Sequence, residues 1–176
     1  SERGINHNID LIDEELASEC MFNKFLKKLC TNKSSNKFEE DRHIALKRSI
    51  GFNLHRFKDP INNKVIIFSE DNLSLSASGR TGKGMIMKAI GKMMKVIIEN
   101  GKNFDANERF SFSRISPFTD LLFIDDVQRF FNFDDYFSLI SEGITVERKG
   151  FDKQFLSFEN SPKITISSNY NVQGDD

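Results

Sequence analysis

Three short apolar runs, each rich in β-branched residues, constrain the fold of this chain most strongly. They are Lys64–Phe68 (KVIIF), Leu121–Ile124 (LLFI) and Lys163–Ser167 (KITIS). Short, continuously apolar runs are typical of strands that are buried on both faces, as in parallel sheets. Helical patterns separate the runs, so we predict an α/β fold with a mostly parallel central sheet.

The part of the chain before the first run has a different pattern. Residues from about 9 to 57 carry apolar side chains at helical spacing in two segments, first Phe22, Phe25, Leu26 and Leu29, then Leu46, Ile50, Leu54 and Phe57. We therefore predict a small helical N-terminal region over 1–58 and an α/β core over 59–176.

Composition excludes several classes of protein. The chain has 176 residues and a formal net charge of -1, so a nucleic-acid partner must be held by a local basic patch. No apolar run approaches the roughly 18 residues of a membrane span. Cys20 and Cys30 lack the spacing of a zinc site and are expected to be reduced, which favours a cytoplasmic location.

A glycine-rich segment follows the first run. It consists of Gly79, Arg80, Thr81, Gly82, Lys83 and Gly84, and the apolar spacing after it predicts a helix over Met85–Ile98 that Asn100-Gly101 ends. A strand, then glycines and a lysine, then a helix is the arrangement that holds a polyphosphate, because backbone N–H groups and the lysine surround its oxygens. Against the pattern GxxxxGK[ST], Ala77 replaces the first glycine and Gly84 replaces the hydroxyl residue.

Asp125 and Asp126 directly follow the second apolar run, about 40 residues after Lys83. A buried strand that ends in two carboxylates can present the first to Mg²⁺ and use the second to orient or deprotonate an attacking water. Asn169 follows the third run, where its amide can donate to a phosphate oxygen and accept from that water. We interpret these residues as an ordered set.

A hairpin is predicted between the acidic pair and the third run. Ile144–Glu147 and Gln154–Phe158 have strand character, and Gly150 between them permits a tight turn. The turn carries Arg148, Lys149 and Lys153. An ordinary charged hairpin is the competing interpretation.

Together these segments resemble the superfamily 3 helicases, which are AAA+-type P-loop ATPases of viral, phage and mobile-element replication proteins. The likeness covers the chain from about Gly51 to its end, in the segments SASGRTGKG, LLFIDD, ITVERKGFDKQF and SPKITISSNY. It looks closest to phage-type primase–helicases whose loop ends in GKG.

The resemblance implies an ATP-dependent DNA helicase or translocase that uses Mg²⁺ and moves single-stranded DNA. It implies a parallel sheet with the strand before the loop at its centre, a homo-hexamer, and a fused or associated primase. Asp125 matches the metal ligand, Asp126 the water-activating acid and Asn169 the sensor. Arg148, Lys149 and Lys153 match the DNA-binding tip of the family's hairpin. The family's arginine finger lies beyond the last motif, so we expect a core truncated there and weak or no activity from the fragment alone.

Two alternatives stay open. The first is a catalytically weak P-loop module that acts in assembly or recruitment of replication proteins, which Gly84 favours. The second is an ATPase of the packaging or transposition type. The segment SPKITISSNY and the basic hairpin before it favour the helicase family instead.

Overall fold

The computed structural model describes residues 20–32, 35–69, 82–129 and 131–170. The chain divides into two compact units, Ser1–Arg48 and Ser49–Asp176, and each is treated by itself. None of the described helices has the length and apolar character needed to cross a bilayer. The second unit contains a mostly parallel sheet with helices, which confirms the predicted α/β class.

The first unit contains α2 (Met21–Leu29) and most of α3 (Glu40–Asn53), at the places where the spacing predicted helices. Leu26 and Cys30 are buried, and an isolated bridge between Thr31 and Phe38 closes the turn that joins the helices.

The second predicted helix extends less far than its apolar pattern. Its last turn tightens, because Leu54 N donates to both Ile50 O and Gly51 O, and the helix ends at Asn53. Phe57 lies beyond it and is 72% exposed, so the prediction of a helix up to this residue is wrong.

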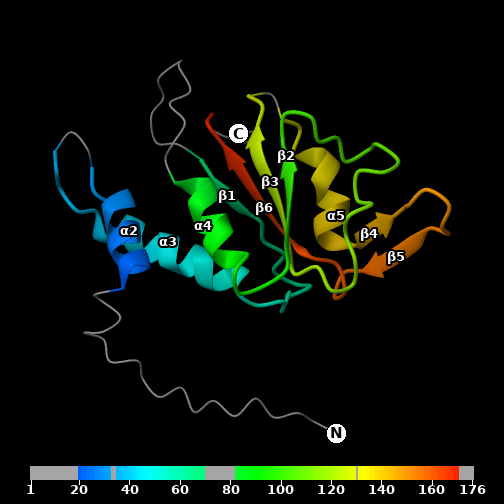
Figure 1. Cartoon of the computed structure of the whole chain (residues 1–176), viewed down its shortest axis with the longest axis horizontal. Coiled ribbons are helices and arrows are strands. Elements are labelled where there is room, and N and C mark those ends of the chain that lie inside the picture. The colour runs from blue at the N-terminus through cyan, green and yellow to red at the C-terminus, as the bar shows by residue number, and fades with distance from the viewer. Residues whose placement is uncertain (1–19, 33–34, 70–81, 130, 171–176) are drawn as a thin grey trace, which may run out of the picture. The chain divides into compact units, whose positions relative to one another are not determined.

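Four parallel strands form the main sheet in the order β1-β6-β3-β2 (Figure 1). They are β1 (Ile66–Phe68), β2 (Val96–Asn100), β3 (Leu121–Val127) and β6 (Lys163–Ser168), so all three predicted strands are confirmed. The strand expected at the centre, β1, instead lies at one edge. It pairs only with β6 within the described residues, and β6 and β3 occupy the centre.

Strand β2 corrects the predicted helix over Met85–Ile98. Helix α4 (Lys83–Ile90) is followed by its C-cap Gly91, and after a short turn Val96–Asn100 pairs residue by residue with β3. The β-branched residues Val96, Ile97 and Ile98 favour a strand, and Ile97 packs against the core. Apolar spacing alone did not distinguish a long helix from a shorter helix followed by a strand.

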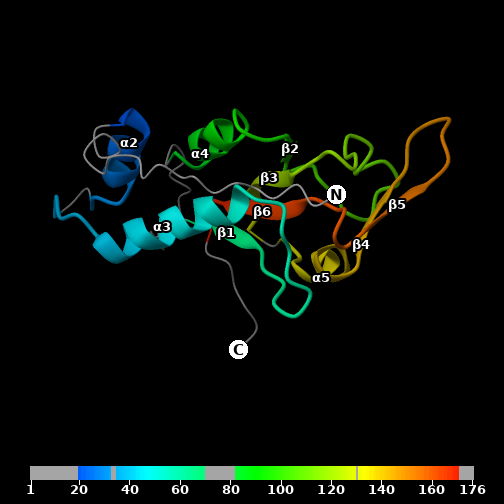
Figure 2. The same cartoon turned by 90° about the horizontal axis from the view of Figure 1, so that it is seen from below.

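The core surrounds β3, whose residues Leu121–Ile124 are fully buried. Helices α4 and α5 (Phe137–Ser141) lie on opposite faces of the sheet (Figure 2), and a 3-10 turn, η1 (Asp134–Tyr136), precedes α5. Strands β4 (Gly143–Val146) and β5 (Gln154–Ser157) pair antiparallel, which confirms the predicted hairpin.

Gly101 directly follows β2, and its backbone lies so close to β3 that the position tolerates no side chain. A Cβ at this position would lie 2.6 Å from Val127 Cγ1 and 2.8 Å from Asp125 O. We predict that Gly101→Ala lowers the free energy of unfolding by about 2 kcal/mol, because the backbones of β2 and β3 must separate. Urea denaturation measures the change.

Gly51→Ala is the matched control, because an added Cβ there meets nothing within 4 Å and Gly51 lies in α3. This variant should gain up to about 1 kcal/mol from helix propensity. Equal urea midpoints for the two variants would contradict the packing argument.

Candidate functional site

Polar residues gather where the strands of the main sheet end. Strands β3 and β6 are parallel, so their carboxyl ends lie at the same edge of the sheet (Figure 1). Asp125 and Asp126 lie at the end of β3, and Asn169 directly follows β6. Open α/β sheets bind ligands at this edge, and α4 begins there with Lys83.

Lys83 connects the start of α4 to the end of β6. Its Nζ donates to the backbone oxygen of Ser168 at 2.7 Å and to Oδ1 of Asn169 at 2.8 Å. The side chain is only partly buried, so the ammonium group lies near the surface of this edge. The structure therefore brings together the lysine and the asparagine that the sequence predicted as site residues.

Asp126 is the next member of the same network. Its Oδ1 accepts a hydrogen bond from Asn169 Nδ2 at 2.5 Å, and its Oδ2 forms an ion pair with Lys102 Nζ at 2.7 Å. Both carboxylate oxygens therefore have defined partners, which fixes the direction of the carboxylate plane.

The backbone at Asp126 is also unusual. Its φ is +61°, in the left-handed region, and the register between β3 and β6 shifts between Ile124 and Val127. Asp126 N donates to Ser167 Oγ at 2.9 Å instead of to a ladder carbonyl. A non-glycine residue in this conformation costs on the order of 1 kcal/mol, and such strain concentrates at functional sites.

Asp125 faces α4. Its Oδ1 accepts a hydrogen bond from Ser167 Oγ at 2.6 Å, and a Cβ added to Gly84 would lie 4.0 Å from its Oδ2. The residue that follows the lysine therefore lies beside the first carboxylate. In the pattern GxxxxGK[ST], a serine or threonine hydroxyl occupies the position that Gly84 has in this chain. The space between Gly84 and Asp125 is therefore open.

The predicted glycine-rich loop is only partly visible. Gly79, Arg80 and Thr81 lie outside the described residues. Gly82 has φ +86° and caps α4, and no side-chain cap bond is found at this helix end among the described residues. The dipole of α4 and its first N–H groups favour an anion at this position.

Two residues of the site were not predicted from the sequence. Lys102 follows Asn100-Gly101, where the apolar spacing predicted a helix end, and Ser167 belongs to a run that was predicted only as a core strand. Hydrogen bonding to Asp126 and the charge of that carboxylate raise the pKa of Lys102 above its ordinary value. The polar residues Ser167 and Ser168 at the end of an otherwise apolar run were the available signal.

The basic hairpin does not join this cluster and extends away from the main sheet (Figure 1). Gly150 has φ +80°, as the tight turn requires, and Lys149 and Phe151 are exposed. Arg148 corrects the expectation of three projecting cations. Its Nε donates to Ser113 O at 2.9 Å and its Nη2 to Ile115 O, so the guanidinium group is held by the segment between β2 and β3.

Glu147 holds the base of the hairpin. Its side chain is 8% exposed and forms ion pairs with Arg109 and with Lys153, the latter at 3.1 Å. Desolvation raises the pKa of Glu147, but the hydrogen bonds from these two cations outweigh it and hold the pKa below its ordinary value. Lys153 is thereby directed toward Glu147.

The cluster contains the kinds of group that bind phosphate oxygens and cations. It combines an ammonium group, the amino end of a helix, two adjacent carboxylates and a carboxamide at one sheet edge. The described residues contain no group of three or more His, Cys, Asp or Glu side chains that could hold a metal by themselves. A cation at Asp125 would therefore need further ligands from water or from the bound molecule.

The fold and the site thus define an α/β protein with a polar site at the carboxyl edge of a parallel sheet. Residues 75–176, more than half of the chain, match the family of unknown function DUF5906, and the chain belongs to this family. No curated protein matches the sequence.

The ion pairs of Glu147 predict a loss of stability in acid. Its pKa is lower in the folded than in the unfolded chain, so its contribution is present above the ordinary value of 4.5 and is lost as the pH falls through the folded pKa. Between pH 6 and pH 3.5, wild type should lose more stability in urea than Glu147→Gln. The exposed Glu142→Gln should behave as wild type, and equal losses in all three proteins would exclude the assignment.

Proposed function

We propose that this chain is the nucleotide-hydrolysing part of a DNA translocase or helicase that resembles superfamily 3. One observation carries the proposal: Lys83, Asn169 and Asp126 form a continuous chain of hydrogen bonds, with Asp125 beside the position that follows Lys83. Three sequence segments that are far apart supply these groups. Their convergence supports a P-loop type of ATPase site.

Lys83 and the amino end of α4 bind the phosphates in this proposal. The ammonium group now donates to Ser168 O and Asn169 Oδ1. A phosphate oxygen would replace one of these acceptors, so the lysine is already aimed at the sheet edge where the ligand would lie. The amino end of α4 adds positive potential at the same place.

Mg²⁺ is the cation that an ATPase of this type requires, and the residues present fit it. Asp125 supplies a carboxylate oxygen, Oδ2, on the side that faces Gly84. Oxygen ligands suit Mg²⁺, which keeps several waters when it is bound with a nucleotide. When bound, this cation would neutralise charge on the phosphates.

Asp126 accepts the proton of the attacking water in this scheme. Asn169 holds one oxygen of the carboxylate and Lys102 the other, so the carboxylate cannot rotate without breaking a hydrogen bond or an ion pair. A general base that is already held in position contributes to catalysis, because it need not be reoriented before each reaction. The asparagine connects this base with Lys83 and can transmit the presence of a phosphate.

The exposed end of the hairpin is the proposed contact with single-stranded DNA. Lys149 provides an ammonium group for phosphate, and Phe151, which is 75% exposed, provides a ring on which a base can stack. Arg148 instead supports the loop through backbone carbonyls. Assembly as a homo-hexamer and association with a primase follow from the resemblance and belong to the same proposal.

A second candidate function is a nucleotide-binding module with weak catalysis that assembles or recruits replication proteins. The observation that favours it is the open space between Gly84 and Asp125, where no hydroxyl completes the cation site. In that case the nucleotide would act as a structural ligand.

Asp126→Asn tests the proposed catalysis. In the protein at its full natural length, this variant should bind ATP within about threefold of wild type and lose at least about 10²-fold in turnover, because an amide cannot accept the proton. Asp152→Asn, on the exposed hairpin, is the control and should retain turnover. Unchanged hydrolysis by Asp126→Asn would exclude Asp126 as the base.

Gly84→Ser separates the two candidate functions. The added hydroxyl would lie beside Asp125, so Mg²⁺-dependent ATP affinity should rise several-fold, whereas Gly84→Ala fills the same space without an oxygen and should not change it. If the serine variant also gains turnover, the site is an ATPase whose cation binding was limiting. If it gains affinity alone, the weak module is favoured.

The hairpin prediction concerns salt dependence. Changing Lys149 and Lys153 together to Ala should weaken single-stranded DNA binding and reduce the salt slope by about 0.7 for each phosphate that the hairpin no longer binds. Lys149→Ala alone leaves the ion pair of Lys153 with Glu147 intact and should give part of the effect. Changing the exposed Lys88 and Lys92 instead is the control, and equal effects from both pairs would contradict a hairpin contact.

A further inference from the structure

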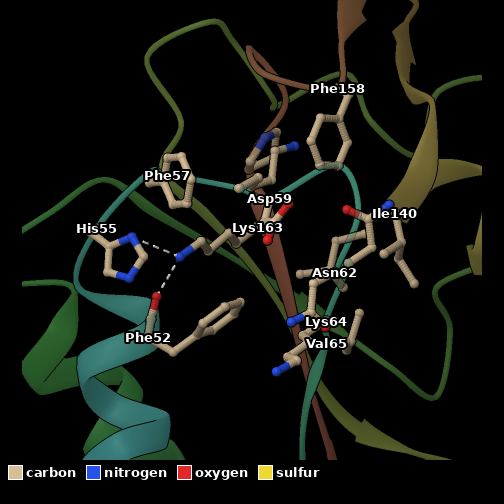
Figure 3. Close-up of a pocket in the computed structure, with 14 residues that line it drawn as sticks. Phe52, His55, Phe57, Asp59, Asn62, Lys64, Val65, Ile140, Phe158 and Lys163 are labelled. Atoms are coloured by element: carbon tan, nitrogen blue, oxygen red, sulfur yellow. Dashed lines mark hydrogen bonds between the residues drawn. The ribbon is translucent and has the colours of Figure 1, made fainter.

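A pocket of about 230 Å³ lies at the amino ends of the strands of the main sheet, where β1 and β6 begin (Figure 3). The candidate nucleotide site lies at the carboxyl ends of the same strands. The pocket is formed by the last turn of α3 and the segment that leads from it into β1, by a residue of α5, and by the start of β6 with the segment before it. Its lining includes the aromatic rings of Phe52, Phe57 and Phe158, and the amines of Lys58 and Lys163.

Lys163 is buried in this pocket without a carboxylate partner. The residue is 3% exposed, and its Nζ bonds to Phe52 O at 2.6 Å and to His55 Nδ1 at 3.1 Å. The same Nζ lies 3.8 Å from the centre of the Phe52 ring (Figure 3). Lysines are almost never buried unless they are paired with an anion.

Lys58 repeats this arrangement. Its Nζ donates to Ser161 Oγ at 2.6 Å and lies 4.4 Å from the centre of the Phe158 ring. Neither Lys58 nor Lys163 forms an ion pair with a carboxylate in the part of the chain that the structure describes. Two amines thus line one pocket, and each forms hydrogen bonds only to neutral groups among the described residues.

The charges around the pocket are unbalanced. The pKa of Lys58 and the pKa of Lys163 are each lowered to about 8, and desolvation is the largest cause of both shifts. The charge of Lys58 contributes to the shift at Lys163, whereas at Lys58 the charge of Arg56 adds to the lowering and the charge of Glu159 offsets part of it. Both amines therefore remain mostly protonated at neutral pH. Lys64 adds a cation to the lining of the pocket. The one carboxylate among the lining residues, Asp59, accepts a hydrogen bond from the backbone N–H of Ile61 in its own turn.

We propose that this pocket binds a small phosphate monoester whose apolar body packs among the three phenylalanine rings. A monoester carries close to two negative charges at pH 7, which matches two ammonium groups, whereas a single carboxylate would leave one of them uncompensated. The rings would bury the ester group and exclude water from the charge pairs.

This site is distinct from the proposed nucleotide site. Lys163 begins β6 and Ser168 ends it, so the two edges are separated by about 17 Å along the strand. Loss of one site therefore need not affect the other.

Phenyl phosphate is the probe, and its binding is measured by calorimetry in a Lys83→Ala background that removes the other phosphate site. Lys163→Met and Lys58→Met should each weaken binding at least tenfold, while Lys92→Met, exposed and remote in sequence, should not. Inorganic phosphate should bind at least about tenfold more weakly, because it has no ring to bury. Neutral benzyl alcohol should not bind detectably.

Absence of binding, equal binding by the methionine variants, or equal affinity for inorganic phosphate would overturn the proposal. A second measurement does not depend on the folding of the methionine variants. In the Lys83→Ala protein, the pKa of the Lys163 amine, followed by NMR, should rise by at least about half a unit when phenyl phosphate is added, because the bound anion favours the ammonium form. An unchanged pKa at saturating ligand would also overturn it.

Discussion

Parallel pairing of β3 with β6 is the constraint on which the candidate site depends. These two central strands end side by side, so the chain delivers Asp126 and Asn169 to one place although 42 residues separate them. The pairing is stabilised by the fully buried body of β3, which supplies the hydrophobic contribution. The polar groups at the strand ends then form hydrogen bonds to one another, and they lie where burial is incomplete.

The same sheet separates two kinds of chemistry. At its carboxyl edge, anionic and amide groups balance the cations, because Lys102 pairs with Asp126 and Lys83 bonds to Asn169. At its amino edge, Lys163 is buried against aromatic rings and a histidine, with neutral partners only. In the proposed functions, the first arrangement would let the lysines exchange their acceptors when a nucleotide binds, and the second would hold a bound anion.

Sequence reasoning located β1, β3 and β6 and the residues that end them, because short apolar runs rich in β-branched residues favour buried strands and parallel strands end on the same side of a sheet. It failed at β2, where the same apolar residues also fit the face of a helix and only pairing with β3 decides. Lys102 was missed for that reason, since it follows this strand. The burial of Arg148 against backbone carbonyls could not be predicted, because the contacting loop has no regular pattern.

NMR titration of the chain with ATP and Mg²⁺ tests the central claim most directly. The amide signals of Gly82, Gly84, Asp126 and Asn169 should shift together with one affinity, and AMP should leave them unchanged because it lacks the phosphates that Lys83 would bind. Signals near Lys163 should not follow the ATP curve. ATP-induced shifts confined to the amino edge, or no shift at Gly84 and Asn169 at saturating ATP, would contradict the account.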